Sequence, residues 1–91
     1  MRQQTRLYVV NIKKNRSEEI GVFLKNKGNN IVIHDMRTFP NVYTRCQIEI
    51  GDKIISVNGE KQYSAQITSQ IIKETGPFLS LLVERSTRDF E

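Results

Sequence analysis

The stretch IGDKIISVNG, residues 50–59, decides how this chain folds. The Gly51-Asp52 pair predicts a turn, because glycine supplies backbone freedom and an aspartate side chain bonds its own turn. The run KIISV at 53–57 is rich in β-branched residues and has the length of a strand. Asn58-Gly59 is the strongest short signal for a hairpin, since both residue types tolerate a positive φ. The stretch therefore predicts a turn, a buried strand and a hairpin turn in direct succession.

The bulk composition allows one small domain. The chain has 91 residues, of which 37% are apolar and 26% are charged, so its core is thin and a large buried cofactor site is not expected. No apolar run approaches the roughly 20 residues of a membrane span, and the N-terminus lacks the apolar core of a signal peptide. The single cysteine, Cys46, excludes an internal disulfide and fits a reducing compartment. We expect no cofactor and no metal.

The net charge of +4 has two interpretations, a solvated surface or an anionic partner. The basic residues are dispersed, with one denser patch at 13–16 that has no interleaved aromatic residues. Nucleic acid is therefore not the expected partner. The sequence also contains no nucleophile elbow or triad motif, so the chain is not expected to be an enzyme.

The order of predicted elements is typical of a small β-rich domain. Strands are predicted at 6–12, 20–24, 31–34, 53–57, 60–62 and 78–84, with a turn cluster at 25–30 and a turn at 39–43 that leads into a short helical segment. The main helix is predicted over 64–74, with Ser64 as its cap and Gly76-Pro77 after its end. The predicted class is α+β, mostly β: a partly open antiparallel barrel of five to six strands capped by two helices. The domain is placed at 6–85, with a flank at 1–5 and a tail or linker at 86–91.

The stretch at 50–59 closely resembles the GD-x-I-x-x-V-N-G signature of PDZ domains, and the element order matches the metazoan form of that fold. The resemblance covers residues 6–85. PDZ domains bind the free C-terminal tail of a partner, and their x-Φ-Gly-Φ loop matches Glu19-Ile20-Gly21-Val22 here. The chemistry of such a loop is an anion nest, in which successive backbone N–H groups hold a carboxylate through charge-assisted hydrogen bonds.

The resemblance implies a groove in which the ligand adds a strand between the second strand and the main helix. The groove residues it implies are Phe23, Leu24, Lys25, His34, Ser64, Ala65, Thr68, Ser69 and Ile72. Either Ala65 or Ser64 stands at the helix position that sets the ligand class in this family, and the Ser64 register turns Ile67 and Ile71 inward. Because neither residue is a histidine, a hydrophobic ligand residue is expected two positions before the ligand's end.

Three features of the resemblance leave alternatives open. Lys14 and Arg16 stand where a basic residue of the family often supports the ligand carboxylate, but a solvated loop explains them equally well. Glu18 and Glu19 would oppose an anion unless they point outward. Anionic lipid is an alternative ligand, through the cations Lys13, Lys14, Arg16, Lys25 and Lys27.

The resemblance also implies a biological setting. The expected partners are the C-terminal peptides of membrane receptors, channels or signalling proteins. The chain would be a monomeric scaffolding domain of a larger protein, located in the cytoplasm at the inner face of a membrane or at a cell junction. A regulatory domain of a larger enzyme is the remaining alternative.

Overall fold

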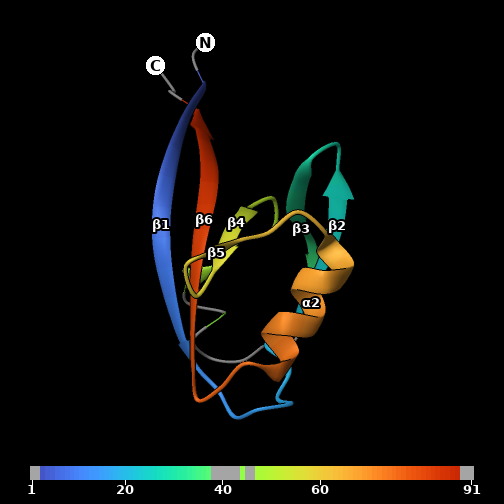
Figure 1. Cartoon of the computed structure of the whole chain (residues 1–91). Coiled ribbons are helices and arrows are strands. Elements are labelled where there is room, and N and C mark those ends of the chain that lie inside the picture. Colours follow the sequence, from blue (N-terminus) through green and yellow to red (C-terminus); the bar gives the residue numbers. More distant parts are fainter. Residues whose placement is uncertain (1–2, 38–43, 45–46, 89–91) are drawn as a thin grey trace.

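Six antiparallel strands form one open sheet with a helix packed beside it (Figure 1). The computed structural model describes residues 3–37, 44 and 47–88. The elements are β1 (Gln3–Lys13), β2 (Val22–Lys27), β3 (Asn30–Met36), β4 (Lys53–Val57), β5 (Glu60–Lys61), α2 (Ala65–Glu74) and β6 (Phe78–Arg88). The strand order is β1-β6-β4-β3-β2, and β5 pairs with β4 at the side. The predicted fold class is confirmed. The turn predicted at 39–43, and Cys46, lie outside the described residues, and Thr44 and Gln47, after that turn, are helical.

The strands β1 and β6 are longer than predicted. They pair without a break from Gln3↔Arg88 to Lys13↔Phe78, and Figure 1 shows the resulting ribbon extending toward the two termini. Residues 3–5, placed in a flank, and 86–88, placed in a tail, are therefore part of the sheet. The hydrophobic pattern gave no sign of this extension because its residues are polar. Thr5 lies opposite Ser86, a hydroxyl pair that suits antiparallel strands.

The core follows the period-2 alternation of the strands. On β1, Val10 and Ile12 are buried, whereas Leu7 and Val9 face outward. The same alternation buries the inward residues of β3 and β6, namely Ile31, Ile33, Leu79, Leu81 and Val83. Burial of each such side chain contributes about 1.5–3 kcal/mol before the loss of conformational entropy is counted.

The structure of α2 distinguishes between the two registers predicted for this helix. The Ser64 side chain caps it by accepting a hydrogen bond from the Ile67 N–H at 3.3 Å. Its buried face consists of Ala65, Thr68 and Ile72, whereas Ile67 is 60% exposed. The register that turned Ile67 inward is therefore wrong. The buried Thr68 hydroxyl is satisfied by a hydrogen bond to Gln62 Oε1 at 3.2 Å.

The turns predicted around β4 are present. Asp52 Oδ2 accepts a hydrogen bond from the Glu49 N–H at 2.9 Å, as expected of an aspartate that bonds its own turn. Asn58 and Gly59 have φ values of 48° and 84°, as the hairpin prediction requires. Asn58 also bonds β6, since its Oδ1 accepts a hydrogen bond from the Ser80 N–H at 2.7 Å.

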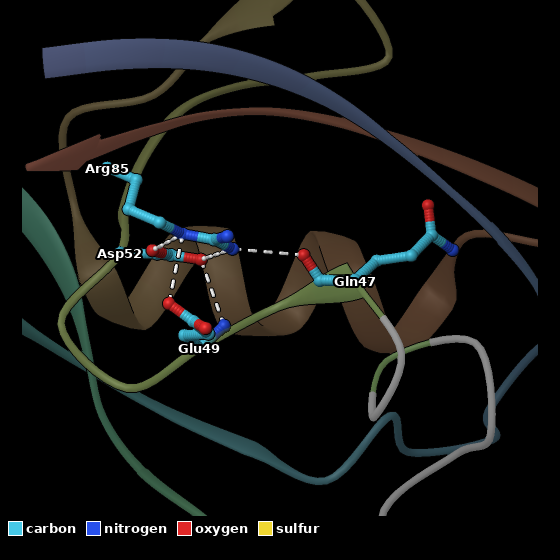
Figure 2. Close-up of polar contacts among 4 residues, drawn as sticks. All are labelled: Gln47, Glu49, Asp52 and Arg85. Carbon is cyan, nitrogen blue, oxygen red and sulfur yellow. Dashed lines mark hydrogen bonds and ion pairs between the residues drawn. The ribbon is translucent and has the colours of Figure 1, made fainter. Parts of the chain in front are cut away.

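Asp52 has a second role that the sequence did not indicate. Its carboxylate, 1% exposed, accepts two hydrogen bonds of 2.9 Å from Arg85 on β6 (Figure 2). Arg85 also donates to Gln47 O at 3.1 Å, and its guanidinium carbon lies 4.8 Å from the centre of the Tyr8 ring. The hydrogen bond to Asp52 is the main reason that the pKa of Arg85 is raised. These contacts connect the paired strands β1 and β6 to the segment before β4.

Candidate functional site

A groove of about 450 Å³ runs between β2 and α2. The strand-side wall is continuous in sequence over 19–24, and β3 with its continuation adds His34 and Arg37. The helix-side wall consists of Gln66, Ser69, Gln70, Ile72 and Lys73. Because β2 is an edge of the sheet, one side of the groove presents strand backbone rather than side chains alone.

The loop at one end of the groove depends on a glycine. Gly21 has a φ of 85°, a left-handed conformation that a residue with a Cβ rarely adopts. Its carbonyl accepts a hydrogen bond from the Arg37 N–H at 2.8 Å, which holds the loop against the end of β3. The positive φ is therefore the physical reason for a glycine at this position.

The floor of the groove is apolar. Ile20 and Ile72 are buried, and Val22 and Leu24 are half-buried along the same face of β2. These four residues all line the groove. Such an apolar floor beside a few polar groups is typical of a ligand pocket.

The two acidic residues of the loop are both engaged. Glu19 forms an ion pair with Arg37, and each of these side chains is about half exposed. Glu18 accepts a hydrogen bond from the Asn15 N–H at 3.0 Å, within its own loop. The sequence did not identify Arg37. Arg37 places a guanidinium in the groove lining next to Glu19 and offsets the charge of that carboxylate.

Lys14 is not part of a solvated loop. Its side chain is buried, and its Nζ donates hydrogen bonds to Lys73 O at 3.1 Å and to Thr75 O, both at the C-terminal end of α2. Burial lowers the pKa of this ammonium, and attraction to Glu18 partly opposes that effect. Lys14 does not line the groove, and its burial also removes it from the exposed cations considered for a lipid surface. Arg16 is exposed and likewise lies outside the groove lining.

The opposite end of the groove is fastened by Asn26, at the end of β2. Its Oδ1 accepts a hydrogen bond from the Ala65 N–H at 2.9 Å, and its Nδ2 donates to Tyr63 O at 3.1 Å. One side chain thus satisfies a free N–H in the first turn of α2 and holds that turn against β2.

Four other predicted groove residues lie around the lining rather than in it. Ala65 and Thr68 face the core, Ser64 caps the helix, and Lys25 is exposed on β2. His34 does line the groove, and it faces outward beside Phe23 with ring centres 6.5 Å apart.

Three helical residues of the lining were missed by the sequence analysis, Gln66, Gln70 and Lys73. With Ser69 they form an i, i+3, i+4, i+7 stripe. That spacing could have identified them once the register of α2 was chosen.

Solved structures provide the comparison. MUPP1 PDZ4 is 19% identical with a TM-score of 0.76, covering 93% of this chain and 80% of that one. The fifth PDZ domain of InaD is 21% identical with a TM-score of 0.73, covering 93% and 99%. The N-terminal PDZ domain of InaD, solved in complex with a NorpA C-terminal peptide, is 20% identical with a TM-score of 0.71, covering 89% and 98%. No protein-family model matches the sequence, and a search of curated proteins finds no match.

The chain therefore has the fold of a PDZ domain, with the groove between β2 and α2 as its candidate site. Within the part of the chain that the structure describes, no cluster of His, Cys, Asp or Glu could hold a metal ion. In that same part, no helix has the length and apolar character needed to cross a bilayer.

Proposed function

We propose that this chain is a protein-interaction module that binds the free C-terminal tail of a partner protein in the groove between β2 and α2. The observation that carries the proposal is the closed end of that groove, where the Gly21 turn meets an apolar floor. The N-terminal PDZ domain of InaD, which has the same fold, was solved in complex with a NorpA C-terminal peptide, and this supports a C-terminal peptide as the ligand.

Binding follows from the chemistry of the two walls. The ligand's main chain adds to the edge strand β2, so its backbone pairs with a strand that otherwise ends the sheet. The terminal carboxylate reaches the amides of 20–22, with Arg37 and Lys73 as nearby cations. The last side chain enters the apolar floor. A contact of a few residues supports a dissociation constant of roughly 1 μM, or about −8 kcal/mol.

The biological role that fits such a module is scaffolding. Its ligands would be the tails of receptors, channels or signalling proteins at the inner face of a membrane, and the chain itself would perform no catalysis. A screen against a library of free C-terminal peptides tests this role. Ligands that shift the NMR signals of β2 and α2 would support it, whereas hits that shift only other surfaces would reject the groove as the site.

Gly21→Val is expected to abolish measurable peptide binding. A β-branched residue at a φ of 85° is strained, so the loop turns away and its amides no longer converge on the carboxylate. Arg16→Ala is the matched control in the same loop, because Arg16 is exposed; it should weaken binding only slightly, and less so at high salt. Isothermal titration of both folded variants provides the comparison. Normal binding by Gly21→Val would show that the loop is not the carboxylate site.

The ligand residue two positions before the end should be hydrophobic. Within the described residues, the helix wall offers Gln66 and Ser69 but no imidazole to bond a ligand hydroxyl. Two peptides that differ only by Thr against Val at that position should bind equally, or Val more tightly. A tenfold preference for Thr, about 1.4 kcal/mol, would show that another donor performs the role of the histidine.

A further inference from the structure

The loop before the Gly21 turn is attached to the C-terminal end of α2 at several points. The Ser17 N–H donates to Lys73 O at 2.9 Å, and the Lys14 N–H donates to Pro77 O at 3.0 Å. The Lys14 ammonium adds its two hydrogen bonds to Lys73 O and Thr75 O. These partners are carbonyls at or just beyond the end of the helix, where no intrahelical donor remains for them.

The junction is also close-packed. A Cβ added to Gly76 would lie 2.8 Å from the Arg16 N and 2.9 Å from the Lys14 O, both backbone atoms. The loop therefore has no room to shift toward Gly76, which follows the C-cap of α2. In the loop itself Ser17 has a φ of 68°, an uncommon value for a residue other than glycine.

Lys14 is the one side chain in these contacts. Lys14 as a residue is 3% exposed, so its ammonium carries a large desolvation cost, which the helix carbonyls and the negative end of the helix dipole offset. Lys73 links the two parts directly: its carbonyl receives the loop, while the residue itself lines the groove.

We infer that Lys14 is a positioning residue for the terminal carboxylate. It holds the loop at 15–21 to the end of α2, so that the loop and the helix form one rigid unit at this end of the groove. The inference rests on the proposed function. It assigns Lys14 an action through the helix carbonyls rather than by contact with the ligand. Asn26 performs the matching role at the open end, where it fastens β2 to the first turn of α2.

The test compares Lys14→Met with Lys14→Arg and with Lys13→Met, an exposed neighbour on β1 that serves as the matched control. The first measurement needs no ligand: backbone ¹⁵N relaxation of residues 17–22. In the wild type and in Lys13→Met we expect order parameters near 0.85, whereas Lys14→Met should bring the loop below about 0.6 and leave β1 and β6 unchanged. Lys14→Arg should restore part of the rigidity.

The second measurement is the affinity for a free C-terminal peptide. Lys14→Met should lose tenfold or more, and the loss should persist at high salt because it arises from position rather than from long-range attraction. If Lys14→Met does not fold, Lys14→Gln, whose amide can still donate to one carbonyl, replaces it. A folded variant with a loop as rigid as the wild type would overturn the inference, whatever its affinity. A wild type that binds no free C-terminal peptide would reject the proposed function, and the relaxation data would still decide the role of Lys14.

Discussion

Replacing Asp52 with alanine should destabilise the fold by about 3–5 kcal/mol, because it leaves the Arg85 guanidinium without its buried partner. Asp52 is 1% exposed and accepts two parallel hydrogen bonds from Arg85 (Figure 2). It also accepts the Glu49 N–H of its own turn, so the substitution removes a turn contact at the same time. Urea denaturation of the wild type and the variant measures the change in the free energy of unfolding.

The matched control is Lys53→Ala, one residue further along the chain. Lys53 forms an ion pair of 3.7 Å with Glu84, and both side chains are about one-third exposed. Such surface pairs contribute about 0–1 kcal/mol, so this variant should change stability little. If Asp52→Ala lowers the free energy of unfolding no more than Lys53→Ala does, the pairing of Asp52 with Arg85 does not stabilise the fold.

A double-mutant cycle measures the interaction energy between Asp52 and Arg85 separately from their contacts with other residues. Arg85→Met combined with Asp52→Ala should be less destabilising than the sum of the two single changes, because the second substitution removes the stranded charge left by the first. Strict additivity of the two changes would contradict a direct pairing of Arg85 with Asp52.

The fold could be predicted because its signals are local. The turns at both ends of β4 depend on residue types whose backbone preferences act within four residues, and the cap and end of α2 are equally local. The polar extension of the β1–β6 ribbon was missed, since there each strand is specified only by its partner across the ladder.

The site was predicted only in part. The residues at 19–24, with Ser69 and Ile72, line the groove as the motif indicated. Lys14 and Lys73 are 59 residues apart, and no periodicity in the chain relates them. The roles of Arg37 and Asn26 likewise depend on contacts between separate elements. The sequence left open whether Lys14 is solvated or supports a ligand, and its burial is explained by hydrogen bonds to helix carbonyls that no local pattern reveals.

The second large effect is expected from the ligand rather than the protein. A terminal carboxylate that leaves water needs several charge-assisted hydrogen bonds, and we propose that the amides of the loop ending in Gly21 donate them. A terminal amide carries no charge and offers one acceptor fewer, and its NH₂ group would face the same backbone donors. We expect amidation of the peptide terminus to weaken binding by about 2 kcal/mol or more.

The most direct test of the account is therefore a calorimetric comparison of one peptide with a free C-terminus and the same peptide amidated, at equal ionic strength. If the groove holds the terminal carboxylate, the free acid should bind at least about 30-fold more tightly, which corresponds to about 2 kcal/mol. The Gly21→Val variant should bind neither form measurably. Equal affinity of the wild type for the two peptides would contradict the account, because the groove would then recognise an internal segment rather than the end of a chain.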